Sequence, residues 1–476
     1  MRIEKVVAII PPAGGSSFTG QSIPPLGIIR ILNYVKKFFQ HIEVELWDGV
    51  LMSMPLILEK VKTLQKGTLV AISAHTSYNY KNCLAVLGAI PEGVKVVLGG
   101  LHLYETHLGQ IAIEKQNFHA IQGPGEFALP QYIEYLEGKR KIFEVKNLMY
   151  LQDGIFTTNE AEYFSQEEFT FPEYENLVNL EEYGKHYREI FGESDLALVV
   201  MSPEGCLWKK KSKGCLFCDI GSAYRSHSPL FLPKWITHHI EKYGDKKRIT
   251  FWDYADEVSG AGFEWWEEVE RNMKNLNLRP GKDFALKVYA KSGCGFFDND
   301  KIASVLSHCG TEIIHLGVEG GDNQTLASWH KGCAVDDYVK SADIAGRHGL
   351  KMIISFAIGA PGTTKQSIAN IYNLIARMKE KANIIAIAAL TVAPMPGSLM
   401  WGMIEKRIKE NHSKRYDDLF RTDDPDLEEI RQIWIKEMCP DLVKESGSLT
   451  RTMEWLRNEA EAICKLSSSK IISRIE

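Results

Sequence analysis

Residues 196–218 read LALVVMSPEGCLWKKKSKGCLFC, an apolar run of strand length that leads into a loop with three cysteines. Eight residues separate Cys206 from Cys215, and two separate Cys215 from Cys218. Thiolates with this spacing can surround one metal centre, and the lysines between them stabilise their negative charge. Three ligands leave one coordination position open. An iron–sulfur cluster needs such an open position on one iron if it is to bind and reduce a substrate-like molecule. The loop is therefore the clearest functional signal in the chain.

The three cysteines also fit two alternatives. One is a structural zinc site whose fourth ligand is His227, and the other is a set of unrelated buried thiols. Structural zinc sites usually have a second tight pair of ligands, whereas His227 stands alone.

The cysteine loop follows the first of six strand-like runs that alternate with helical patterns. The expected strands are Leu196–Met201, Arg248–Trp252, Ala285–Tyr289, Glu312–Val318, Lys351–Ile358 and Asn383–Val392. Helical patterns lie near residues 231–243, 263–276, 299–308, 336–348 and 365–381. Six βα units predict a partial TIM-like barrel, in which the loops after the strands carry the chemistry.

The first 140 residues show the same alternation over five βα units. The expected strands are Lys5–Ile10, Glu43–Trp47, Leu69–Ser73, Lys95–Leu98 and His119–Gln122. Helical patterns lie near residues 26–39, 54–65, 79–89, 105–115 and 126–137. Several of these strands end in small or polar residues, and parallel sheets bind ligands beyond the carboxyl ends of their strands. This half of the chain is predicted to be a ligand-binding, Rossmann-like domain.

The pattern divides the chain into four regions and gives an α/β fold class. A Rossmann-like domain covers residues 1–140, and a linker with a hairpin near Gln152-Asp153-Gly154 covers 141–192. The partial (βα)6 barrel covers 193–396, and a small helical C-terminal cap covers 397–476.

Composition excludes several classes of protein. The 476 residues include 56 Lys and Arg against 61 Asp and Glu, a net charge of −5 with no block of basic residues, which disfavours nucleic-acid binding. The longest apolar run, Ile384–Ala393, is far shorter than the ~20 residues that cross a bilayer, so no membrane span is expected. Nine cysteines, an odd number, favour a reducing cytoplasm over a disulfide framework.

The cysteine loop, with Phe217 directly before the third cysteine, resembles that of the radical S-adenosylmethionine (SAM) enzymes. Within them the chain resembles the subgroup that carries an N-terminal cobalamin-binding domain. The resemblance implies that Cys206, Cys215 and Cys218 hold a 4Fe–4S cluster, and that the amino and carboxylate groups of SAM take the fourth iron. The first gap is longer than the three residues most common in the family.

Two later motifs support the resemblance because they occur in the family's order. Gly317-Val318-Glu319-Gly320-Gly321 resembles the Gly-x-Glu-Ser-Gly strand end, whose glutamate accepts hydrogen bonds from the SAM ribose. Gly359-Ala360-Pro361-Gly362-Thr363-Thr364 resembles the Gly-x-Pro-Gly-x-Thr turn, where Gly359, Pro361 and Gly362 approach the adenosine and a threonine caps the next helix. The alternatives are an exposed glutamate and an ordinary strand-to-helix turn.

Four further positions match the family's SAM contacts less specifically. Asp253 and Asp256 lie where the family contacts the SAM amino group, although surface or helix-capping acids fit as well. Arg225 matches a Tyr-Arg element after the cluster loop, with a structural salt bridge as the alternative. Lys291 is favoured over Lys287 as the partner of the SAM carboxylate.

Two cysteines of the expected barrel, Cys294 and Cys309, are candidates for quenching a radical. A buried inert thiol is the alternative for each.

The ends of the strands in the first half resemble the landmarks of the cobalamin-binding domains. Gly99 and Gly100 would let the corrin approach the backbone, and the hydroxyls of Ser73, Thr76 and Ser77 would meet its nucleotide tail. The Asp-x-His-x-x-Gly element that supplies a histidine to cobalt in some cobalamin proteins is absent from the sequence. The alternative is a scaffold domain without a corrin.

The resemblance implies that an electron delivered to the cluster cleaves SAM to methionine and a 5′-deoxyadenosyl radical. This radical would abstract a hydrogen atom from an unactivated carbon of a small-molecule substrate or biosynthetic intermediate. Methylcobalamin would then supply the methyl group to that carbon. Flavodoxin or ferredoxin is the expected kind of electron donor. Two alternatives remain: a radical rearrangement, dehydration or carbon–carbon bond formation with a vestigial cobalamin domain, and a zinc-stabilised binding or sensor protein.

Overall fold

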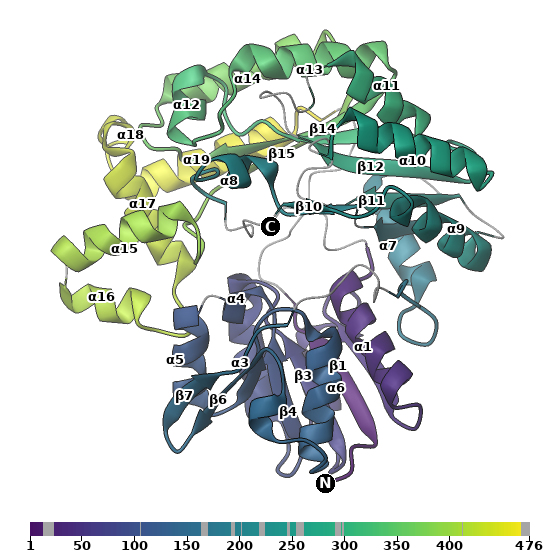
Figure 1. Ribbon diagram of the computed structural model, residues 1–476. Coiled ribbons are helices and arrows are strands. Elements are labelled where there is room, and N and C mark those ends of the chain that lie inside the picture. Colours follow the sequence, from purple (N-terminus) through teal and green to yellow (C-terminus); the bar gives the residue numbers. More distant parts are fainter. Residues whose placement is uncertain are drawn as a thin grey trace. The chain divides into compact units, whose positions relative to one another are not determined.

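The computed structural model describes residues 1–12, 23–104, 106–162, 170–191, 196–200, 202–218, 224–244, 248–253, 261–290, 297, 299–411 and 413–467. The chain divides into two compact units (Figure 1). The first comprises Met1–Tyr183 with Glu405–Asp426, and the second comprises Gly184–Ile404 with Leu427–Glu476. In the described part of the chain, none of the helices is both long and apolar enough to cross a membrane.

The first unit is built on a seven-stranded sheet in the order β2-β1-β3-β4-β5-β6-β7. Its five parallel strands are β1 (Lys5–Ile10), β2 (Glu43–Asp48), β3 (Thr68–Ser73), β4 (Lys95–Gly99) and β5 (His119–Ile121). The strands are short and β-branched, and each predicted strand is confirmed to within one residue at either end. In a sheet with the order 2-1-3-4-5, ligands bind where the order reverses, between β1 and β3.

Helices cover both faces of the first sheet. They are α1 (Leu26–Phe38), α2 (Met54–Val61), α3 (Tyr80–Ala89), α4 (Leu101–Tyr104), α5 (Thr106–Gln116) and α6 (Gly125–Leu136), with a short η1 (Ser77–Asn79) before α3. α1 packs against α6 on one face. On the other face Val7, Ile9, Val70 and Ile72 form one core with α2, α3 and α5. This alternation is what a parallel sheet between two helix layers requires.

The linker region contributes to both units. The expected hairpin is β6 (Leu148–Gln152) and β7 (Ile155–Thr158), and it pairs antiparallel with β5, so it extends the first sheet. A short η2 (Ile142–Glu144) precedes the hairpin. The linker also holds a helix that the sequence analysis missed, α7 (Leu180–Phe191), whose first turn is capped by Asn179. Its buried Tyr183 and Tyr187 are four residues apart and so share a face.

The second unit contains six parallel strands in sequential order, as predicted for a (βα)6 partial barrel. They are β8 (Leu196–Val200), β11 (Ile249–Asp253), β12 (Phe284–Ala290), β13 (Thr311–Gly317), β14 (Lys351–Ile358) and β15 (Ile384–Thr391). The helices between them are α9 (Phe231–Tyr243), α10 (Phe263–Asn275), α11 (Asp300–His308), α12 (Asn323–Ser328), α13 (Val335–Arg347) and α14 (Lys365–Lys379). In Figure 1, α10, α11, α13 and α14 lie on one side of this sheet. The predicted α/β fold class is confirmed.

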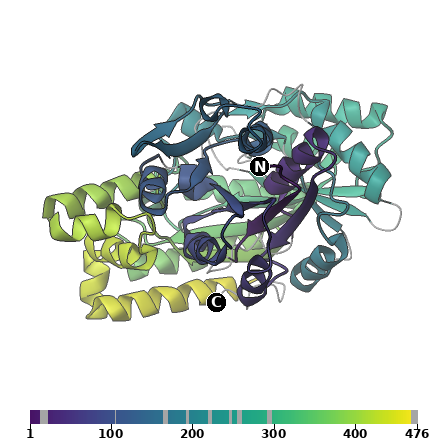
Figure 2. The same ribbon diagram turned by 90° about the horizontal axis from the view of Figure 1, so that it is seen from below.

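The C-terminal region is helical, as expected, but it is shared between the units. Its helices are α15 (Leu399–Asn411), α16 (Ser413–Phe420), α17 (Leu427–Met438), α18 (Pro440–Ser446) and α19 (Leu449–Cys464). Residues 405–426 cluster with the first unit. α19, yellow in Figure 2, packs along β15 of the second unit, where the Ala389 amide donates to Cys464 Sγ at 3.2 Å.

Gly100 is required by the turn between β4 and α4. Its φ is +106°, and a Cβ there would lie 2.3 Å from the Ala74 carbonyl oxygen. Gly27 lies near the start of α1 with no atom within 4 Å of the position of a Cβ. We expect Gly100→Ala to lower the free energy of unfolding by about 2 kcal/mol or more, since strain and a backbone clash coincide. The matched Gly27→Ala should change it by less than ~1 kcal/mol in the same guanidinium titration. Equal effects of the two substitutions would contradict this role of Gly100.

Candidate functional site

The cysteine loop begins at the carboxyl end of β8 and is fixed there by Asp253. The Ser202 amide donates to Asp253 Oδ1 at 3.3 Å, and the Ser202 hydroxyl also donates to this carboxylate. Asp253 ends β11 and is buried, so the surface-acid alternative is wrong. Its carboxylate holds the first turn of the loop, and contact with a SAM amino group stays a prediction.

The three cysteines lie at the two ends of this loop, half-buried and unbridged. Cys206 stands directly before the short helix α8 (Leu207–Lys211), while Cys215 and Cys218 share a turn in which the Cys218 amide donates to the Cys215 carbonyl at 3.1 Å. Among the described residues, no three His, Cys, Asp or Glu side chains converge on a point where one metal ion would bind. His227 stacks on Phe231, with ring centroids 4.3 Å apart. His227 therefore packs against the first residue of α9 (Phe231–Tyr243).

A turn beyond α12 supports the cysteine loop. The Leu216 amide donates to the Trp329 carbonyl at 2.9 Å, and Trp208 Nε1 donates to the His330 carbonyl at 2.9 Å. The ring of Phe217, the aromatic residue predicted beside the cluster, meets Trp329 edge to face at 5.2 Å. Both ends of the cysteine loop are thus fixed on one turn.

Glu319 lies where β13 ends, and its surroundings correct one alternative of the sequence analysis. Its side chain is only 10% exposed and its carboxylate forms an ion pair with Lys331 at 3.7 Å, so it is not a surface glutamate. Its φ is +68°, in the left-handed region that few such residues adopt, and the Glu319 amide donates to the Ser355 carbonyl at 3.0 Å. Burial raises the pKa of Glu319, and the Lys331 ammonium opposes this shift. Gly317 precedes it as the last residue of β13 and pairs with Ser355 of β14.

Gly321 makes room for α14. A Cβ on Gly321 would lie 2.2 Å from the Ile371 backbone nitrogen.

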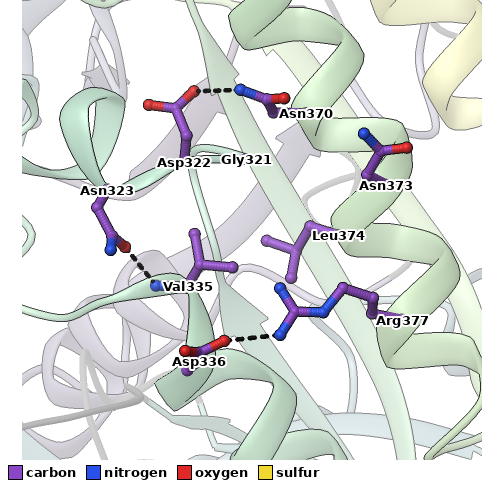
Figure 3. A pocket seen from close by; sticks show the side chains of 9 residues that line it. All are labelled: Gly321, Asp322, Asn323, Val335, Asp336, Asn370, Asn373, Leu374 and Arg377. Atoms are coloured by element: carbon purple, nitrogen blue, oxygen red, sulfur yellow. Dashed lines mark hydrogen bonds and ion pairs between the residues drawn. The ribbon is translucent and has the colours of Figure 1, made fainter.

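Gly321 also borders a cavity of about 380 Å³ (Figure 3), lined by Gly321, Asp322, Asn323, Val335, Asp336, Asn370, Asn373, Leu374 and Arg377. Asp336 pairs with Arg377 at 2.6 Å, and Asn370 Nδ2 donates to Asp322 at 3.2 Å. Because each of its charged side chains already has a partner within the lining, we assign this cavity no ligand.

Two glycines of the turn after β14 have positive φ, a conformation that glycine adopts readily. Gly359 has φ +107° and Gly362 has φ +78°, and Pro361 stands between them. The Gly359 carbonyl accepts from Trp434 Nε1 at 2.8 Å, and the Gly362 amide donates to the Met438 carbonyl at 2.8 Å. Helix α17 therefore holds this turn, and Thr364 caps α14 by accepting from the Ser367 amide. Contact with adenosine stays a prediction.

Several other predicted site residues of the second unit lie outside the part of the chain that the structure describes. Asp256, Lys291 and Cys294 lie outside the described residues, as does the side chain of Arg225 on β10 (Arg225–Ser226), which pairs with β9 (Pro203–Glu204). Lys287 is buried on β12, where its ammonium donates to the Tyr187 hydroxyl.

Cys309 is buried beside α10, with its Sγ 3.8 Å from the Trp266 carbonyl oxygen. Burial raises the pKa of its thiol. These surroundings favour the inert-thiol alternative.

The sequence analysis missed a buried group beside the cysteine loop. The Cys333 thiol lies 3.0 Å from the Tyr338 hydroxyl. Burial raises the pKa of Tyr338, and nearby Cys333, Glu319 and Cys215 add to the shift. Tyr338 therefore lies near both the cysteine loop and Glu319. The only sequence signal was Lys331-Gly332-Cys333 after a short helix, and nothing in it distinguishes this turn from an ordinary one.

In the first unit, the predicted cobalamin contacts gather at the carboxyl ends of β3 and β4. The Ser73 carbonyl accepts from Asn79 Nδ2 at 3.2 Å, and the Gly99 carbonyl accepts from the Ala74 amide at 2.7 Å. Thr76 Oγ1 is buried and has no hydrogen-bond partner within the described residues. Beside these groups, two large side chains are exposed, Tyr78 by 40% and Leu101 by 60%.

His102 and Asp423 join the C-terminal segment of the first unit to this sheet edge. His102 Nε2 donates to the Asp423 carbonyl at 2.8 Å, and the Ser77 hydroxyl donates to His102 Nδ1 at 2.9 Å. The Asp423 side chain is 1% exposed and accepts from Lys115 at 2.8 Å and from the Tyr80 hydroxyl at 3.2 Å. Both ring nitrogens of His102 are therefore engaged.

Burial lowers the pKa of His102 to about 4, below the ~6.5 of an unfolded chain. Between these values the unfolded state binds more protons, so stability falls as the pH is lowered through this range. We expect His102 to contribute about 2 kcal/mol to the loss of unfolding free energy between pH 7 and pH 5. His102→Gln should remove that part of the pH dependence in denaturant titrations, whereas the exposed His41→Gln should not. The same pH dependence in all three proteins would contradict the burial of a neutral His102.

Comparisons with known proteins agree with this architecture. No family model matches the chain. An uncharacterized methyltransferase of Pyrococcus horikoshii is 23% identical over 420 residues, which cover 84% of this chain and 83% of that protein. The radical SAM methyltransferase TsrM from Kitasatospora setae, solved with cobalamin and a 4Fe–4S cluster, has a TM-score of 0.64 at 13% identity over 85% of this chain and 75% of its own. The cobalamin-dependent SAM radical enzyme OxsB, solved with aqua-cobalamin and SAM, has a TM-score of 0.64 at 14% identity over 86% of this chain and 61% of its own. The chain has the fold of these cobalamin-dependent radical SAM enzymes.

Proposed function

We propose that this chain is a radical SAM enzyme that transfers a methyl group from cobalamin to an unactivated carbon of a small molecule. The observation that carries the proposal is that one chain combines the two parts such a reaction needs. A three-cysteine loop lies at the carboxyl end of the first strand of the (βα)6 sheet, and a separate 2-1-3-4-5 sheet presents polar and apolar groups at its own carboxyl edge. The similarity to TsrM and OxsB extends over both units.

The cysteine loop fits a 4Fe–4S cluster by the chemistry of its donors. Cys206, Cys215 and Cys218 are half-buried thiols without a disulfide, and iron–sulfur clusters are held by thiolates. Asp253, Trp329 and the His330 carbonyl fix the backbone that carries them. In this role the loop holds three irons and leaves the fourth for the amino and carboxylate groups of SAM.

Glu319 fits the ribose of SAM because a carboxylate offers several lone pairs to two neighbouring hydroxyls. Burial raises the pKa of Glu319, and the paired Lys331 ammonium opposes this shift and so favours the ionised form that accepts these bonds. Gly359 and Gly362 have positive φ and no side chains, so the backbone after β14 could approach the adenosine closely.

The first unit fits a corrin through two observations at its carboxyl edge. Thr76 Oγ1, buried and without a partner in the described part of the unit, is placed to bond a nucleotide tail. The exposed Tyr78 and Leu101 offer apolar surface to a large flat ring. His102 would not bind cobalt without losing its bonds to Ser77 and Asp423.

When bound, these cofactors supply the reducing equivalent, the radical and the methyl group of the reaction. The protein's own task is to bind and orient them and to exclude water and oxygen from the site. A one-electron donor of the flavodoxin or ferredoxin class completes the system.

The cluster is tested by anaerobic reconstitution with iron, sulfide and a strong reductant, followed by incubation with SAM. We expect the wild-type chain to hold about four irons per chain and to release 5′-deoxyadenosine. Replacing Cys206, Cys215 and Cys218 together by Ala should abolish both, because no thiolate ligands remain. The matched Cys309→Ala should retain both, since that thiol is buried beside α10. A colourless wild-type chain, or zinc without iron and sulfide, would refute the proposal.

Cobalamin binding is tested by the visible absorption of hydroxocobalamin titrated into the chain. Thr76→Val keeps the shape of the side chain but removes its hydroxyl, so we expect about a fivefold weaker affinity and unchanged stability. Thr63→Val, at an exposed site on the first unit, should bind as the wild type does. A wild-type chain that forms 5′-deoxyadenosine but never binds the corrin would favour a radical reaction without methyl transfer.

A further inference from the structure

The turn Trp329–Cys333 lies between the cysteine loop and Glu319, and the end of α12 fixes its backbone. The Trp329 amide donates to the Thr325 carbonyl and the Lys331 amide to the Leu326 carbonyl, both at 3.0 Å. His330 has φ +57°, the left-handed conformation that commonly ends a helix. The turn is therefore attached to the end of α12 by its own backbone.

One side of this turn is packed against the cysteine loop. It accepts hydrogen bonds from the Leu216 amide and from Trp208 Nε1, both at 2.9 Å. Gly332 has φ +67°, and a Cβ on it would lie 2.2 Å from the Trp208 ring, so the contact needs glycine. A shift of the turn would move the loop that carries Cys215 and Cys218.

The other side of the turn presents the Lys331 side chain to Glu319. Lys331 is 5% exposed and its ammonium lies 3.7 Å from Glu319 Oε1. Burial of a Lys–Glu pair adds little to stability, because desolvation of both charges offsets their attraction. Stability of the fold is therefore not a sufficient reason for the pair.

We propose that Lys331 is a positioning residue for SAM: it orients the Glu319 carboxylate toward the ribose hydroxyls from a turn that also fixes the cysteine loop. The inference rests on the proposed function and adds a residue to it. Lys331 acts through Glu319 and does not touch SAM. Its ammonium, 3.7 Å from Glu319 Oε1, favours the ionised carboxylate against the effect of burial, and both oxygens of an ionised carboxylate accept hydrogen bonds.

The test is calorimetric binding of SAM to the oxidised, cluster-loaded chain, where no turnover occurs. We expect Lys331→Met to weaken SAM binding about tenfold and Lys331→Arg to restore most of it. The wild type should bind the 2′-deoxyribose analogue of SAM about tenfold more weakly than SAM, whereas Lys331→Met should discriminate much less. The exposed Lys340→Met on α13 serves as the control and should match the wild type.

A double variant keeps the inference testable if Lys331→Met alone does not fold, because Glu319→Gln/Lys331→Met leaves no unpaired buried charge. If Lys331 acts only through Glu319, this double variant should bind SAM as weakly as Glu319→Gln and no more weakly. A double variant much weaker than Glu319→Gln would overturn the inference. So would a Lys331→Met chain that binds SAM and its analogue as the wild type does. A wild-type chain that holds its cluster but does not bind SAM would instead refute the proposed function itself.

Discussion

The site depends on one constraint: in a parallel sheet, all strands end at the same edge. The loops after β8, β13 and β14 are more than forty residues apart in the sequence, yet they emerge from a single six-stranded sheet in a fixed order. That order places the cysteine loop and Glu319 at one edge of the second unit. The turn after α12 then joins them through hydrogen bonds to Leu216 and Trp208 and through the Lys331–Glu319 pair.

Both units bury charged groups in contact with charged or polar partners. Glu319 and Lys331 are buried together in the second unit, and Asp423 is buried against Tyr80 and Lys115 in the first. Desolvation makes such groups costly unless each has partners, and here each has at least one. In the second unit the charges lie where a cofactor would need an ionised carboxylate. In the first, Asp423 and His102 attach residues 405–426 to the edge of the sheet.

The sequence predicted the elements better than their long-range partners. The pattern of apolar residues and the composition located every parallel strand, because each strand is a short apolar run bounded by turn residues. Helix α7 was missed because the acidic, proline-containing stretch before it was interpreted as a linker, although Leu180, Tyr183 and Tyr187 recur at helical spacing. The motifs located Glu319 but not Lys331, since a lysine twelve residues later has no local signal of burial. The burial of Asp423 could not be predicted from the sequence either, because its partners lie about 300 residues earlier in the chain.

The helices after residue 396 take part in the site, although composition indicated only a cap. Trp434 of α17 donates to the Gly359 carbonyl, and Ile435 lies 2.9 Å from where a Gly359 side chain would begin. The Gly362 amide donates in turn to the Met438 carbonyl. Helix α17 therefore packs against the turn that is predicted to contact adenosine and fixes its backbone. Packing of α17 therefore favours glycine at position 359, independently of any ligand that approaches the turn. A match to the glycine motif has two physical causes here, helix packing and ligand approach.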